Sequence, residues 1–150
     1  MAEYDSTKDT IDHKEKVKKF MNLCIDDLVM RAENHDNSKL ESPEKKYFDE
    51  YSPKLKDCTY GSDDYQKCLD GLKPALDHHY KVNSHHPEHY ENGVNGMTLV
   101  DLLELICDWK ASSMRHEDGD INRSIKVNKD RFKLSDQLVD ILKNTVKEYF

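Results

Sequence analysis

The feature that most constrains the fold is a helical repeat of apolar residues between residues 9 and 34. The apolar side chains recur at steps of three and one residues, at Val17, Phe20, Met21, Cys24, Ile25, Leu28, Val29 and Ala32. This spacing places them on one stripe of an α-helix, and such a stripe normally packs against other apolar surface. His13 and His35 project on or near the same stripe, where a solvated helix would carry aliphatic residues.

Further helix signals follow along the rest of the chain, and we find no strand pattern. Ser-Pro-Glu at 42–44 and Ser-Asp-Asp at 62–64 are typical helix starts, because Ser caps the first turn and Pro is tolerated there. The segment after Thr98 is apolar nearly all round, so we expect it to be the central helix. The sequence predicts an all-α fold, a single compact domain over residues 1–150 with about five to seven helices. They are expected at about 9–34, 42–52, 62–83, 98–115, 121–131 and 135–149, with an interruption at Ser52-Pro53.

The charge pattern limits the partners of the chain. Charged residues make up 35% of the sequence, its mean hydropathy is −0.94 and its formal net charge is −7. General nucleic-acid binding needs a basic surface, so we do not expect it, and an anionic substrate would need a local group of basic residues. No apolar run approaches the roughly 20 residues of a membrane span, and Met1–Lys8 contains no apolar export signal. We therefore expect a cytoplasmic protein without a membrane partner.

Histidine is the unusual part of the composition. Five of the eight histidines fall between residues 78 and 89. His79 and Asn83 share the apolar face of their predicted helix, whereas His78 is rotated off that face and is interpreted as a bystander. His85-His86 precedes a proline, so we expect this pair to lie in a loop.

An adjacent His-Asp pair at 35–36 can place an imidazole nitrogen and a carboxylate oxygen on one metal ion, and the carboxylate can bridge to a second ion. Asp108 lies on the apolar helix after Thr98, where a carboxylate is costly unless it is paired, hydrogen-bonded or metal-bound. Each candidate alone has an ordinary explanation, such as a hydrogen-bonded core histidine, but the set favours a metal centre. Seven candidates exceed what one ion takes, so we expect two divalent transition-metal ions (Fe, Mn, Co, Ni or Zn) about 3.5–4 Å apart. The candidate ligands are His13, His35, Asp36, His79, His85, His86 and Asp108.

The order of these residues resembles that of the metal-dependent HD-domain phosphohydrolase superfamily, and in particular a family of small, largely uncharacterised bacterial and phage proteins. The likeness spans nearly the whole chain. It is carried by His35-Asp36-x-Ser38-Lys39 with Pro43-Glu44, by His79-x-x-x-Asn83-x-His85-His86-Pro87-Glu88, by Glu104-x-x-x-Asp108-Trp109 and by Arg131-Phe132.

The resemblance implies an HD-domain-like metal-binding domain over residues 1–150 and a role for each ligand. One ion would be held by His13, His35, Asp36 and Asp108. The second ion would be held by the bridging Asp36 with His79, His85 and His86. Lys39 would contact substrate phosphate, as the corresponding lysine does in some members of the superfamily.

The expected function is metal-dependent hydrolysis of a phosphomonoester or phosphodiester, in a nucleotide or another small phosphate-containing substrate. Asp36 and Lys39 are the expected catalytic residues, and the candidates for substrate binding are Lys39, Asn83, Arg115 and Arg131. One alternative is an HD-type di-iron oxygenase, since a His-rich site also binds iron. Another is a non-catalytic protein that binds a nucleotide or a partner on a metal-stabilised scaffold. The sequence leaves the oligomeric state open.

Overall fold

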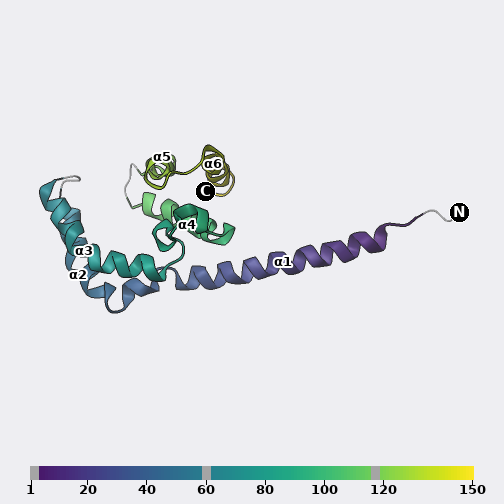
Figure 1. Ribbon diagram of the computed structural model, residues 1–150, viewed down its shortest axis with the longest axis horizontal. Coiled ribbons are helices and arrows are strands. Elements are labelled where there is room, and N and C mark those ends of the chain that lie inside the picture. Colours follow the sequence, from purple (N-terminus) through teal and green to yellow (C-terminus); the bar gives the residue numbers. More distant parts are fainter. Residues whose placement is uncertain (1–3, 59–61, 116–118) are drawn as a thin grey trace. The chain divides into compact units, whose positions relative to one another are not determined.

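The computed structural model describes residues 4–58, 62–115 and 119–150, and these residues form helices and no strand (Figure 1). The predicted all-α fold class is confirmed. The α-helices are α1 (Thr7–Asn34), α2 (Glu44–Asp57), α3 (Asp63–Val82), α4 (Leu99–Ser113), α5 (Ile121–Phe132) and α6 (Asp136–Tyr149), and the short 3-10 helices are η1 (Asn37–Leu40), η2 (Pro87–His89) and η3 (Gly93–Gly96).

The chain divides into two compact units, Met1–His35 and Asp36–Phe150. In its described residues, the first unit consists of the 28-residue helix α1 and the short segment before it. This helix begins and ends close to the bounds that the apolar repeat predicts. The prediction that residues 1–150 act as one domain stays a prediction.

In the second unit, α2 and α3 lie side by side. Gly71 of α3 allows this close approach, because a Cβ atom at that position would overlap the ring of Tyr51 on α2. The predicted interruption at Ser52-Pro53 is wrong, since α2 continues through Pro53 to Asp57. Proline removes one helical hydrogen bond, but it falls in the last turns of a helix that packing against α3 stabilises.

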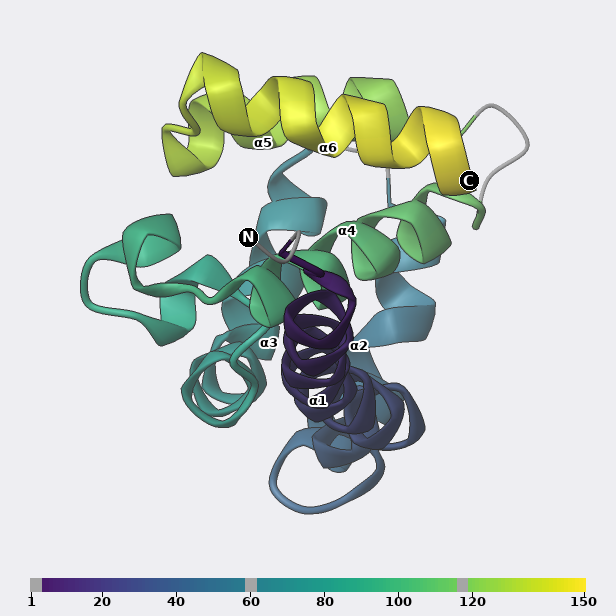
Figure 2. The ribbon, with the colours of Figure 1, turned by 90° about the vertical axis from the view of Figure 1, so that its right-hand side faces the viewer.

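The core of the second unit lies between α4, α5 and α6. Figure 2 shows α5 and α6 side by side above α4. Asp101 at the start of α4 is buried because its carboxylate accepts hydrogen bonds from Thr98, Ser84 and Tyr90. The buried side chains of the cluster that these three helices form are Ile106, Ile121, Ile125, Leu134, Val139, Leu142 and Val146.

None of the helices in the described parts of the chain has the length and hydropathy that a membrane span needs.

Candidate metal centre

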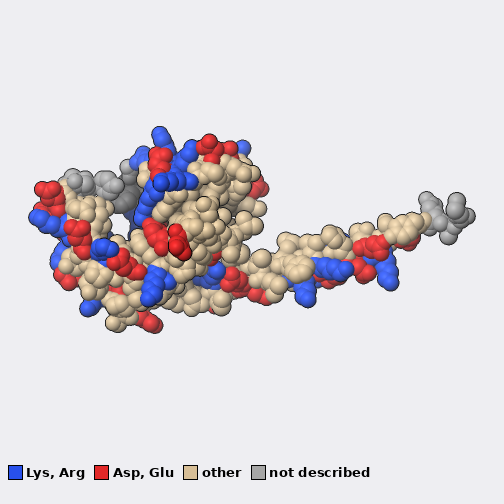
Figure 3. Space-filling model, viewed as in Figure 1, with Lys and Arg blue, Asp and Glu red and all other residues tan. Residues whose placement is uncertain are grey.

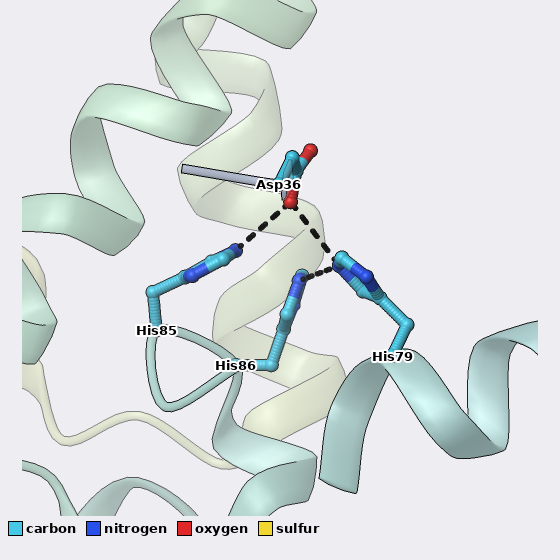
Figure 4. Close-up of side chains that lie close together, drawn as sticks. All are labelled: Asp36, His79, His85 and His86. Atoms are coloured by element: carbon cyan, nitrogen blue, oxygen red, sulfur yellow. Dashed lines mark hydrogen bonds and ion pairs between the residues drawn. The ribbon is translucent and has the colours of Figure 1, made fainter. Parts of the chain in front are cut away.

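Four of the seven predicted ligands come together in the second unit: Asp36, His79, His85 and His86 (Figure 4). Each offers one ligand atom, and these four atoms lie within 4.8 Å of one another. His79 Nε2 lies 3.2 Å from Asp36 Oδ1 and 3.0 Å from His86 Nε2, and His85 Nε2 lies 3.6 Å from Asp36 Oδ1. A tetrahedral ion with ligands at about 2.0–2.1 Å keeps neighbouring ligand atoms roughly 3.3 Å apart. The four atoms therefore have the spacing of a single ion's ligands.

The local backbone brings these side chains together. Asp36 joins the end of α1 to η1 in a left-handed conformation, with φ of 59°. Aspartate tolerates this conformation better than most residues do. His79 lies in the last turns of α3, which ends at Val82. The chain then turns, so that His85 and His86 point back toward His79 (Figure 4). The loop predicted for the His-His pair before Pro87 is what permits this return.

Two carboxylates, the buried Glu44 and the partly buried Glu104, fix the orientation of two histidine rings. Glu44 Oε2 lies 2.9 Å from Nδ1 of His79, and Glu104 Oε1 lies 3.1 Å from Nδ1 of His85. Because an ionised carboxylate only accepts hydrogen bonds, Nδ1 of each ring carries the hydrogen and Nε2 carries a lone pair. Asp36 Oδ1 and the two Nε2 atoms are then three acceptors that face one another. A cation placed among these three acceptor atoms would be attracted by all of them at once.

The third ring also suits metal binding, because it is neutral near pH 7. Burial, together with the neighbouring His85 and His79, lowers the pKa of His86 from its usual 6.5 to about 3. The carboxylates of Asp108 and Asp36 act in the opposite direction but are outweighed. A neutral imidazole keeps a lone pair for a metal ion, so protons compete little for His86 at ordinary pH.

Glu44 belongs to the Pro43-Glu44 motif of the resemblance, but sequence reasoning assigned it no role. It is fully buried, with 0% exposure, and it accepts hydrogen bonds from Ser38 Oγ, His78 Nδ1 and His79 Nδ1 at 3.1, 2.7 and 2.9 Å. The Ser-Pro-Glu helix start accounts for its place in the first turn of α2, but no pattern marks it as buried. Because Glu44 contacts Nδ1 of His79, we infer that it would position this ring as a metal ligand.

His78 differs from the bystander that the helix phase predicts. Its side chain is 37% exposed, yet its Nδ1 lies 2.7 Å from Glu44 Oε1, within hydrogen-bond distance. The phase itself is as expected, since His79 is 1% exposed and faces the other ligands.

We predict that His79→Ala removes the bound metal while His78→Ala keeps it. His78 would affect a bound ion through its contact with Glu44, which in turn contacts His79. Changing an outer partner of a ligand typically costs 10–100-fold in metal affinity, so we expect a loss of about tenfold or less for His78→Ala. Metal affinity measured by competition with a chelating dye tests the pair. A severe loss in His78→Ala beside a mild one in His79→Ala would contradict the assignment.

Lys39 lies at the candidate metal centre, where it pairs with the carboxylate of Asp36. Its Nζ is 2.6 Å from Asp36 Oδ2, and it also lies over the ring of Phe48. The ammonium group therefore holds one oxygen of Asp36 while the other oxygen faces the histidines. An ammonium group has three hydrogens to donate, so this contact leaves Lys39 able to bind a phosphate as well.

The other predicted substrate-binding residues are more scattered. Asn83 lies beside the centre, where its amide donates to Ser38 Oγ and to the backbone carbonyl of His79, at 2.9 Å each. Arg131 lies on α5 and pairs with Glu88 at 2.6 Å. Arg115 is exposed just after α4. Of these three residues, only Asn83 contacts a predicted ligand.

The remaining predicted ligands are Asp108, His13 and His35. Asp108 lies on α4, accepts a hydrogen bond from Ser112 and offers an oxygen within 4.8 Å of a ring nitrogen of His85. His13 and His35 belong to the first unit, in which α1 is one continuous helix and His35 is its C-cap residue. At 1.5 Å per residue the two lie about 33 Å apart, so they cannot bind the same ion from one chain.

Comparison with known proteins adds a family but no function. No curated protein and no solved structure matches the chain, and the resemblance to the HD-domain superfamily stays a prediction. Residues 2–148 match the model of a family of unknown function, DUF5662, and the chain therefore belongs to that family.

Proposed function

We propose that this protein is a metal-dependent phosphohydrolase that acts in the cytoplasm on a nucleotide or another small phosphate ester. One observation carries the proposal. Asp36, His79 and His85 direct three acceptor atoms at one point, with the two ring orientations fixed by the carboxylates of Glu44 and Glu104. A cation at that point would interact with all three acceptor atoms at once. The ligand set of imidazoles and a carboxylate suits Zn, Fe, Mn, Co or Ni.

The residues around the four ligands suit phosphate chemistry. A divalent ion bound there would supply a water of lowered pKa and polarise a phosphoryl oxygen. Asp36 keeps one oxygen toward the histidines because Lys39 holds the other. Lys39 brings positive charge to the site, whereas the chain as a whole carries a formal charge of −7, so this lysine is what offsets repulsion of an anionic substrate.

A second ion beside the first belongs to the same proposal. Its support is the approach of Asp108 to His85, together with the capacity of the Asp36 carboxylate to bridge. The Asp108 carboxylate on α4, which accepts a hydrogen bond from Ser112, would then also bind a metal ion.

Elemental analysis of protein purified without oxygen tests this proposal. We expect two ions per chain after loading, because the candidate ligands outnumber what one ion takes. Phosphatase assays on nucleotides and sugar phosphates with Mn, Co, Ni, Fe and Mg should then show turnover that a chelator abolishes. One ion per loaded chain would contradict the two-ion centre. Oxygen consumption without phosphate release would replace the hydrolase with an oxygenase.

A further inference from the structure

The apolar stripe of α1 has no packing partner within its own unit. In residues 4–35, α1 is the single helix, and none of its residues is buried. Phe20 is 64% and Met21 59% exposed, and a shallow groove beside them begins at His13. Most helices in proteins are stabilised by packing of an amphipathic face rather than by helix propensity. The stripe therefore needs an apolar surface from outside the unit.

The two histidines of the stripe are placed symmetrically about Cys24, whereas its apolar residues are centred between Cys24 and Ile25. His13 and His35 are each eleven residues from Cys24, which at 100° per residue places both within about 20° of the line through Cys24 along the helix. Phe20 and Leu28, four residues to either side, lie on the same face. If two copies of α1 packed antiparallel with their Cys24 residues at the centre, each His13 would lie beside the other copy's His35. The 33 Å that separates these histidines in one chain would then be bridged by the second copy.

The charges of α1 also favour an antiparallel pair. Residues 7–23 contain five lysines against three acidic residues, whereas residues 24–34 contain Asp26, Asp27 and Glu33 against one arginine. Figure 3 shows uncharged side chains along one side of α1 and charged ones along the other. An antiparallel arrangement brings the basic half of each helix against the acidic half of the other, while a parallel one would bring like charges together.

We propose that two copies of this chain pair through α1 in antiparallel orientation, centred on Cys24, and that each copy supplies His13 to the ion that the sequence assigns to His35 and Asp36 in the other. The pairing is carried by α1 alone. The role of His13 as a ligand in trans rests on the proposed function.

Disulfide formation at Cys24 tests the pairing without any metal. Cys24 is exposed, and in the proposed pair two Cys24 side chains meet at the two-fold axis. A Cys107→Ser protein treated with oxidised glutathione and a chelator should form a Cys24–Cys24 dimer, with reduced glutathione as the other product. The matched control also carries Cys24→Ser and Asn22→Cys, which moves the thiol about 160° around the helix. We expect cross-linking in the control to be at least tenfold slower, and equal rates would overturn the pairing.

Sedimentation equilibrium provides a second measurement that does not depend on cysteine chemistry. The wild-type protein should have twice the chain mass of 17.6 kDa. The Phe20→Glu protein should be monomeric and should keep at least the helical circular dichroism expected from α2 to α6. A wild-type monomer at all concentrations, with Cys24 slow to react with thiol reagents, would show that α1 packs within its own chain and would overturn the proposal.

Complementation between two variants tests the role of His13. His13→Ala and His35→Ala should each lose one ion per chain. In a mixed dimer isolated through two different affinity tags, one centre regains both histidines, so it should bind one more ion than a dimer of either variant. No gain in a cross-linkable dimer would overturn ligation in trans and leave the pairing. A wild-type protein that binds no metal would overturn the proposed function and the role of His13 together, while the Cys24 result would still decide the pairing.

Discussion

Replacing Asp36 with asparagine should abolish metal binding and any hydrolytic activity. Asparagine retains the shape of the side chain and tolerates the left-handed backbone, with φ of 59°, at this position, so the substitution removes the charge with little backbone strain. The metal-free variant should be as stable as the metal-free wild type or more so, because the new amide can donate to Nε2 of His79 or His85. In the wild type those nitrogens face a carboxylate oxygen at 3.2 and 3.6 Å.

Thermal unfolding with and without metal measures both parts of this prediction. An ion at 100 times its dissociation constant adds about 2.7 kcal/mol of stability, which for a chain of this size raises the melting temperature by roughly 5–10 °C. The wild type should show this rise and Asp36→Asn should not. Asp49→Asn is the matched control, since Asp49 is an exposed aspartate that pairs with Lys45 on α2. An Asp36→Asn protein that keeps the wild-type metal response would show that the four residues are not the binding site.

The sequence predicted the helices well because their apolar spacing follows directly from the geometry of the α-helix. It did less well where packing decides the outcome. Pro53 carries a local signal that ends helices, yet α2 continues past it while packed against α3. No local signal identifies Glu44 as the buried partner of His79, because a glutamate in the first turn of a helix is ordinarily exposed.

The candidate ligands also fall into those that the structure brings together and those that it keeps apart. The convergence of Asp36, His79, His85 and His86 agrees with the prediction from residue chemistry and motif order. His13 and His35 were predicted to share an ion, but the structure does not allow this within one chain. The continuous helix α1 separates the two residues by about 33 Å. The separation of His13 from His35 follows from the rise per residue of an α-helix, so a continuous helix predicted from residue 9 to residue 34 already implies it. A second copy of the chain could supply a histidine across this distance.

Replacing Lys39 with methionine should leave the metal in place and lower kcat/KM about ten- to a hundredfold for the best phosphate ester found. Methionine has a side chain of similar length and removes the charge, together with the cation–π contact with Phe48. The ammonium group is not a metal ligand, so metal content should stay at the wild-type level. A charge-assisted hydrogen bond to phosphate is worth roughly 1.5–3 kcal/mol, which corresponds to the expected fall in rate.

The comparison of metal content with kcat/KM separates two roles for Lys39, which lies 2.6 Å from Asp36 Oδ2. If its main role is to hold the carboxylate, Lys39→Met should weaken metal binding, and excess metal should restore the rate. If it binds phosphate, excess metal should restore nothing, and KM should rise with the fall in kcat/KM. Lys45→Met is the control, because Lys45 is an exposed lysine on α2 with its own aspartate partner. Full activity in Lys39→Met would show that Lys39 does not bind substrate phosphate. The proposed phosphohydrolase would then lose the residue that best distinguishes it from an iron oxygenase at this centre.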